Sequence, residues 1–180
     1  MHWPSAREPI VESVLVRDLI PADLPRILEI NNEAVPAVGV LDAPGLQHLV
    51  DESIVALTAE DGDGETGSHV IGFCLVLGPR ADYESVNFRW FAERYDDFVY
   101  LDRVAIDPAS KGRGIGRAFY ERAAEQIAAR GGADELCLEV NLRPRNDASL
   151  AFHARLGFTE VGQQETPYGA LVSLMTKRLR

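Results

Sequence analysis

The sequence has no apolar run long enough to cross a membrane, which takes roughly 20 residues. Its N-terminus, Met1-His2-Trp3-Pro4, also lacks the basic start and the apolar segment of an export signal. These absences argue against a membrane protein and against a secreted one. We therefore expect a soluble, cytoplasmic protein.

Cysteine is scarce as well. Cys74 and Cys137 are the only two, and each lies inside an apolar run. Neither belongs to the Cys-x-x-Cys or Cys–His spacing that metal and redox sites require. We expect both to be buried as small apolar residues, and we expect no metal site.

Basic residues are too few to balance the acidic ones. Lysine and arginine number 18 against 28 aspartates and glutamates, which gives a formal net charge of -10. This charge opposes attraction to phosphate backbones, so nucleic acid is not an expected partner. An acidic surface suits a cationic substrate better than an anionic one.

The length and the order of predicted elements fit one domain over residues 1–180. Strands and helices alternate in a way that builds a mixed sheet covered by helices. Strands are expected at 14–16, 54–58, 70–77, 98–106, 136–140, 158–161 and 171–175, and helices at 22–33, around Leu46 and Leu49, at 114–130 and at 149–156. The second and third strands should pair in antiparallel fashion.

The segment between Gly78 and Asp97 has neither strand alternation nor a long helical stripe, although part of it could form a short helix. It is predicted to be an insert. Its aromatic residues Phe88, Trp90 and Phe91 either close over a substrate pocket or simply seat the insert on the core.

A glycine turn follows the strong strand at 98–106. Gly112, Gly114 and Gly116 remove the side chains that would keep a bulky anion away from the backbone. The helix that starts there directs unpaired amides and the positive end of its dipole to the same point, so a phosphate group is the expected ligand.

Two common phosphate motifs do not match this turn. No Lys-Ser/Thr follows the glycines, as a P-loop would require. The third glycine of the dinucleotide pattern Gly-x-Gly-x-x-Gly falls on Arg117 or on Phe119. Nucleotide hydrolysis and hydride transfer therefore lose their main support.

The stretch Lys111-Gly-Arg-Gly-Ile-Gly116 closely resembles the acyl-CoA motif of the GNAT superfamily, Arg/Gln-x-x-Gly-x-Gly/Ala, with Lys111 in the first position. A second block, "LCLEVN" followed by "NDASLAFHARLGF", is similar to the family's fifth strand and fourth helix. The two blocks cover about 98–175. The resemblance implies an α/β (α+β) GNAT fold, with a mixed, mostly antiparallel sheet of seven strands that is flanked by helices and has a splayed fourth and fifth strand.

The resemblance also implies an activity, the acetyl-CoA-dependent acetylation of a primary amine, with acetyl-CoA as co-substrate. Residues expected to hold acetyl-CoA are Val104, Ala105, Ile106, Lys111, Gly112, Arg113, Gly114, Ile115, Gly116, Arg117, Asn146 and Phe152. In this scheme the strand backbone at 104–106 holds the pantetheine arm and supplies an oxyanion donor, while amides at 111–117 hold the pyrophosphate.

Two catalytic residues are expected. Glu139 is the favoured base, because an apolar run could raise its pKa; alternatively it points to solvent or pairs with an arginine. Lesser candidates for the base are Asp102, Tyr100 and Glu33. His153 replaces the tyrosine that the family usually has after Phe152, so it is either the acid or an ordinary structural histidine.

The acceptor is expected between the loop after the first helix, the insert and the final hairpin. The residues predicted to bind it are Asn32, Glu33, Tyr100, Trp90 and Tyr168. A small-molecule amine is favoured, with a protein or peptide amine, or a non-catalytic acyl-CoA-binding module, as alternatives. The resemblance also implies a possible homodimer.

Overall fold

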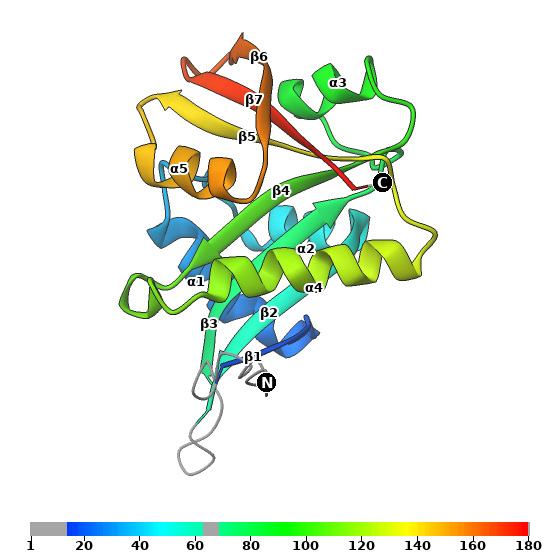
Figure 1. Cartoon of the computed structure of the whole chain (residues 1–180). Helices are drawn as coiled ribbons and strands as arrows, with labels where there is room; N and C mark the ends of the chain where they lie inside the picture. Colours follow the sequence, from blue (N-terminus) through cyan, green and yellow to red (C-terminus); the bar gives the residue numbers. More distant parts are fainter. Residues whose placement is uncertain (1–13, 63–68, 180) are drawn as a thin grey trace, which may run out of the picture.

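The computed structural model describes residues 14–62 and 69–179 (Figure 1). Met1 to Pro4 and the middle of the acidic connection, residues 63–68, lie outside these ranges. Within them, no helix combines the length and the apolar character that crossing a membrane requires.

The centre of the molecule is a seven-stranded sheet. Its strands are β1 (Val14–Asp18), β2 (Ser53–Asp61), β3 (His69–Leu77), β4 (Phe98–Ile106), β5 (Glu135–Arg143), β6 (Thr159–Glu165) and β7 (Leu171–Arg178). They are arranged in the order β1-β2-β3-β4-β5-β7-β6. Every neighbouring pair is antiparallel except β4 and β5. The expected mixed sheet and the antiparallel pairing of β2 with β3 are therefore confirmed.

The parallel pair β4–β5 is short. Its register covers only Phe98–Tyr100 of β4 and Glu135–Cys137 of β5, after which the two strands diverge (Figure 1). This confirms the expected splay. Among the residues that the structure describes, no strand pairs with β4 beyond Tyr100 on that side, so a ligand can bond to its backbone groups there. We call this opening the β4–β5 gap.

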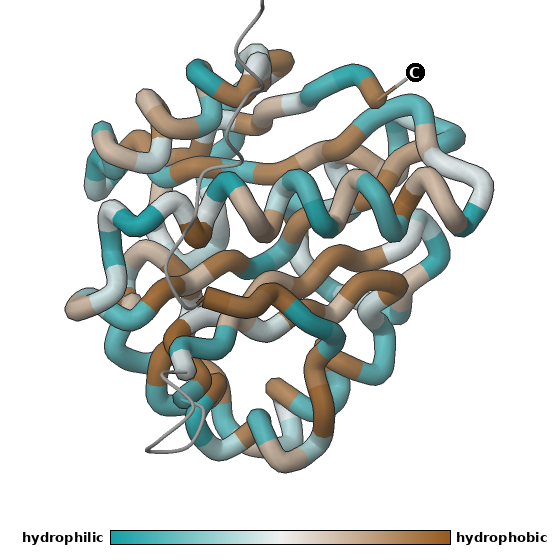
Figure 2. The backbone as a smooth tube through the Cα atoms, turned by 60° about the horizontal axis from the view of Figure 1, so that its bottom comes forward, coloured by the Kyte–Doolittle hydropathy of each residue, from teal (hydrophilic) through white to brown (hydrophobic). Residues whose placement is uncertain are grey.

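Helices cover both faces of the sheet. They are η1 (Pro21–Asp23), α1 (Leu24–Glu33), α2 (Ala43–Glu52), α3 (Val86–Ala92), η2 (Pro108–Ser110), α4 (Ile115–Ala129) and α5 (Asp147–Arg155). One apolar core lies under α1, α2 and α3, and a second lies under α4 and α5. In Figure 2, apolar segments run along the strands, while the helices alternate between apolar and polar residues, as helices with one buried side do.

Burial among apolar residues accounts for the positions of the two cysteines and of the insert. Cys74 and Cys137 are both fully buried, as expected. In α3, Phe88 and Phe91 also lie in the core, where they contact Tyr100 at ring distances of 5.4 and 5.9 Å. These two aromatic residues therefore seat the insert on the sheet.

Candidate active site

A cavity of about 1230 Å³ opens at the β4–β5 gap. Its wall includes residues 33–39 at the end of α1 and in the loop after it, 83–86 at the start of α3, and 101–106 of β4. It also includes 110–112 and 114–117 around the start of α4, 138–139 of β5, the start of α5 and 167–168 of the last hairpin. Small-ligand sites usually occupy roughly 300–1,000 Å³. This cavity is therefore large enough for a long ligand and a second, smaller molecule.

The glycine turn forms one end of the cavity. Gly112 and Gly114 both have φ of +80°, and nothing lies within 4 Å of the position that a Cβ would take. A Cβ on Gly116 would instead come within 3.2 Å of Phe152. No side chain in the described part of the chain caps α4 at Gly114. Open backbone and uncapped amides at a helix start suit an anion, so the turn fits the diphosphate of coenzyme A.

The outer side of the turn is held by ion pairs. Arg113 contacts both carboxylate oxygens of Asp61 on β2, at 2.6 and 3.2 Å. On the other side Arg26 of α1 pairs with Asp107, whose second oxygen accepts from the amide of Ala109. These contacts fix the backbone of the turn. Arg113 itself is not part of the cavity wall.

The backbone of β4 also faces the cavity. The amide of Asp107 donates to the carbonyl of Ile71 on the β3 side, at 2.8 Å. Backbone polar groups alternate between the two sides of a strand, so those of Val104 and Ile106 point into the β4–β5 gap. The pairing of β4 with β3 therefore determines which backbone groups of β4 face the gap and could bond to a strand-like ligand.

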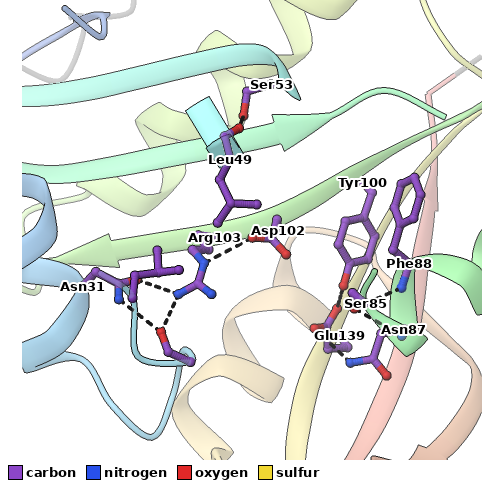
Figure 3. A network of polar contacts seen from close by, with 12 residues as sticks. Asn31, Leu49, Ser53, Ser85, Asn87, Phe88, Tyr100, Asp102, Arg103 and Glu139 are labelled. Carbon is purple, nitrogen blue, oxygen red and sulfur yellow. Dashed lines mark hydrogen bonds and ion pairs between the residues drawn. The ribbon is translucent and has the colours of Figure 1, made fainter. Parts of the chain in front are cut away.

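Glu139 lies on β5 at the other end of the gap (Figure 3). The hydroxyl of Tyr100 donates to one carboxylate oxygen, and the side-chain amide of Asn87 donates to the other at 3.1 Å. Asn87 in turn accepts from Gln164 of β6 at 2.9 Å. Burial raises the pKa of Glu139 to about 7, and nearby Asp102 adds to the rise, while the bonds from Tyr100 and Asn87 oppose it.

A second polar group lies beside Glu139. The side chain of Asp102 is 4% exposed and pairs with Arg103 at 3.2 Å. Burial raises the pKa of Asp102, and Arg103 opposes that rise. Arg103 also donates to Asn31 at 2.7 Å and to the carbonyl of Gly39 (Figure 3). Arg103 thus ties the loop between α1 and α2 to β4.

His153 lies on α5 and is 4% exposed. Its Nδ1 is 2.8 Å from the carbonyl oxygen of Ser149, and its Nε2 is 2.6 Å from the hydroxyl of Tyr120. A carbonyl only accepts, so Nδ1 carries the hydrogen and Nε2 accepts from Tyr120. Burial lowers the pKa of His153, which favours the neutral ring. Both ring nitrogens already have protein partners.

Most of the residues predicted from sequence lie on the wall of this one cavity. They are Glu33, Val104, Ala105, Ile106, Lys111, Gly112, Gly114, Ile115, Gly116, Arg117, Glu139, Asn146, Phe152, His153 and Tyr168.

Four of the predicted site residues do not line the cavity, and Arg113 is one of them. Asn32 bonds to the backbone of Leu41 through both its donor and its acceptor. Tyr100 is fully buried and contacts the wall through Glu139 and through the ring of Tyr83. Trp90 packs against Gly162 of β6, because that glycine leaves room for the indole ring. In the structure these side chains support the site from behind its wall.

Several residues that build the site were not predicted, and Asp61, Asn87 and Tyr120 show why. Asp61 and Asn87 lie 52 positions from the residues they contact, so no local pattern marks them. Tyr120 could have been found, because it follows Gly116 by four positions and so lies on the same side of α4.

Comparison with known proteins agrees with this geometry. Residues 26–158, well over half of the chain, match the Acetyltransferase (GNAT) family. No curated protein matches the chain significantly.

Several solved structures share the fold at low identity. Arabidopsis thaliana NAA60 in complex with acetyl-CoA is 20% identical, with 92% of this chain and 99% of that chain covered and a TM-score of 0.71. The ribosomal-protein-S18-alanine N-acetyltransferase from Escherichia coli is 19% identical, with 92% and 94% covered and a TM-score of 0.66. An N-acetyltransferase from Staphylococcus aureus Mu50 is 16% identical, with 94% and 100% covered and a TM-score of 0.67.

The glycine turn, the β4–β5 gap and the family match all lead to one assignment. Acetyl-CoA is the co-substrate typical of this family, and the turn fits its diphosphate. The chain belongs to the GNAT family and is an acetyl-CoA-dependent N-acetyltransferase.

Proposed function

We propose that this enzyme acetylates the primary amine of a small cationic molecule, and that Glu139 is the base. The observation that carries this proposal is the position of Glu139 on the cavity wall, where Tyr100 and Asn87 hold its carboxylate and burial raises its pKa to about 7. A base works best when its pKa is close to the working pH. A second support is the acidic character of the acceptor end, where Glu33 and Glu84 also line the cavity.

The chemistry follows from these positions. Glu139 takes a proton from the ammonium group, which leaves a neutral amine able to attack the acetyl carbonyl. The backbone amide of Val104, which faces the gap, donates to the oxygen that becomes negative during the attack. The amides of the glycine turn hold the diphosphate, and the side chain of Phe152 packs behind Gly116. Together these contacts fix the thioester between the two ends of the cavity.

The size of the acceptor also has structural support. Residues 33–39, 83–86 and 167–168 border the cavity from three different loops. Such a border favours a compact acceptor over a long chain. Tyr168, which is 73% exposed, lies at this rim and is placed to contact the acceptor.

The test is release of free thiol from acetyl-CoA with a panel of polyamines, amino acids, aminoglycosides and short peptides. We expect the highest kcat/KM with a small polycationic amine. Short peptides are the rival class, because the Escherichia coli enzyme with this fold acetylates a ribosomal protein by its name. Faster turnover of peptides would replace the small-molecule proposal. Tight coenzyme A binding without thiol release would indicate a non-catalytic module. The cytoplasmic location and the homodimer stay predictions.

Removing two rim carboxylates tests the preference for cations. The double variant Glu33→Gln/Glu84→Gln should raise KM for a polycationic amine roughly tenfold, since each exposed pair contributes up to about 1 kcal/mol. The KM for acetyl-CoA should stay the same. The control is Glu93→Gln/Glu125→Gln, which changes the net charge equally at two exposed residues away from the cavity. Equal KM shifts in both variants would point to overall charge and count against an acidic rim.

The pH profile tests the role of Glu139. The base must be ionised, so kcat/KM should rise as the pH passes about 7. Tyr100→Phe removes a hydrogen bond that favours the ionised carboxylate, so the pKa of Glu139 should rise and the midpoint should move to higher pH. Both enzymes are measured with the same amine, so the titration of the amine cancels. Tyr95→Phe, outside the cavity wall, is the control, and an unmoved midpoint in Tyr100→Phe would remove Glu139 from this role.

A further inference from the structure

Two polar groups border the β4–β5 gap from opposite faces of the sheet. Along β5, Cys137 belongs to the core under α1–α3, and Leu138 belongs to the core under α4 and α5. Side chains alternate along a strand, so Glu139 lies on the same face as Cys137 and Tyr100. Tyr120 packs in the other core with Leu138. A thioester in the gap would thus have Glu139 on one side and the Tyr120–His153 pair on the other.

Tyr120 is held firmly in this position. Its ring lies at 5.6 Å from the rings of Phe152 and His153 and at 5.8 Å from that of Phe158, all in edge-to-face contacts. The residue is 7% exposed, yet it forms part of the cavity wall. One turn of α4 separates it from Gly116. Tyr120 therefore faces the cavity just beyond the glycine turn, on the part of the wall past which a ligand bound at the turn would extend toward Glu139.

Other hydroxyls on the wall are placed differently. Ser85 precedes α3, and the Oγ of Ser149 on α5 lies 3.2 Å from Nδ1 of His153, the ring nitrogen that does not contact Tyr120. Tyr83 contacts Asp102 on the opposite face of the sheet. Tyr168 is exposed at the mouth of the cavity, and Ser110 belongs to the turn that holds the diphosphate. Tyr120 is thus the tyrosine on the α4–α5 side of the gap among the described residues of the wall.

His153 is less able than Tyr120 to give up a proton here. Its Nδ1–H donates to the carbonyl of Ser149, and its Nε2 accepts from the hydroxyl of Tyr120. A tyrosine hydroxyl rotates about its carbon–oxygen bond, so its proton can turn from Nε2 of His153 to another acceptor. The imidazole then acts through Tyr120 and is a positioning residue.

We propose that the hydroxyl of Tyr120, held in place by His153, protonates the sulfur that leaves during acetyl transfer. This inference rests on the proposed function. As the carbon–sulfur bond breaks, the electron pair goes to sulfur, and sulfur takes the proton of Tyr120. The phenolate then takes up, through water in the cavity, the second proton that the amine nitrogen loses as the amide forms. The ammonium loses two protons in all, so one is balanced by the new thiol and one is released to solvent.

The test compares two variants in steady-state kinetics. Tyr120→Phe should lower kcat roughly 10²-fold or more, the usual effect of removing a positioned acid, and leave coenzyme A affinity within threefold. His153→Gln keeps an acceptor for the Tyr120 hydroxyl and should retain kcat within tenfold. Tyr95→Phe controls for the loss of a tyrosine hydroxyl elsewhere.

Several outcomes would overturn the inference. If Tyr120→Phe keeps kcat within threefold of the unaltered enzyme, Tyr120 is not the acid. If His153→Gln loses as much as Tyr120→Phe, the imidazole itself donates. His153→Gln alone still decides between the two residues if Tyr120→Phe does not fold. Failure of the proposed function has a different signature, because the unaltered enzyme would then release no thiol with any amine.

Discussion

Glu139→Gln should lower kcat/KM by about 10²–10⁴-fold, the usual contribution of a positioned general base. Glutamine has nearly the same shape and can still accept from Tyr100 or Asn87, so the variant removes the proton acceptor and keeps the wall of the cavity. Most of the loss should be in kcat, because the glycine turn proposed to hold the diphosphate lies at the far end of the cavity. The measurement is thiol release at saturating acetyl-CoA over a range of amine concentrations.

The matched control for this variant is Glu135→Gln, which lies on the same strand but outside the cavity wall. It should leave kcat/KM unchanged. Calorimetry with coenzyme A should give the same affinity for both variants, which shows that each is folded. Turnover of Glu139→Gln within fivefold of the unaltered enzyme would move the base to Asp102, the other buried carboxylate beside the gap.

The accuracy with which the sequence predicts strand boundaries differs from strand to strand. The strand Phe98–Ile106 is predicted to its ends, because apolar and β-forming residues flank Asp102 and Arg103 on both sides and Asp107-Pro108 stops it. β5 was predicted as 136–140 but extends over Glu135–Arg143. The apolar run stops at Val140, because the next residue, Asn141, lines the cavity and is not part of the core. A prediction based on core burial therefore misses the end of β5, where a side chain lines the cavity and is not buried in the core.

β6 shows a different reason for a missed boundary. It was predicted as 158–161 but covers Thr159–Glu165. Its register shifts between Glu160 and Gly162, and Trp90 packs against this glycine. The strand therefore continues through a polar stretch because α3 supports it from outside. A contact with a residue about seventy positions earlier is not visible in local sequence.

Some features of the site follow from local sequence, and others depend on contacts between residues far apart in the chain. The glycine turn could be predicted, because strand, glycines and helix follow one another in the chain. The sequence also singles out His153, which lies on the cavity wall. Its protonation and its partner were not predictable, because they depend on Tyr120 of another helix and on burial. Folding brings α4 and α5 together, and only then is the chemistry of the pair defined.

Gly114→Val should reduce coenzyme A affinity by about 10²-fold or more. The new side chain would occupy the open space beside the turn and keep the diphosphate from at least two amides. A hydrogen bond to a charged group contributes about 1.5–3 kcal/mol, and 1.4 kcal/mol corresponds to a factor of ten in affinity. The positive φ of Gly114 adds backbone strain of about 1–2 kcal/mol, which lowers stability as well.

The other end of α4 provides the control that separates these two effects. Gly131 also has positive φ, +102°, and nothing lies within 4 Å of the place where its Cβ would be, yet it does not line the cavity. Gly131→Val should therefore lose a similar amount of thermal stability and keep full affinity for coenzyme A. Calorimetry measures the affinities and thermal unfolding the stabilities. If both variants lose affinity equally, strain in α4 explains the loss, and the glycine turn would no longer be the part of the chain that holds the diphosphate.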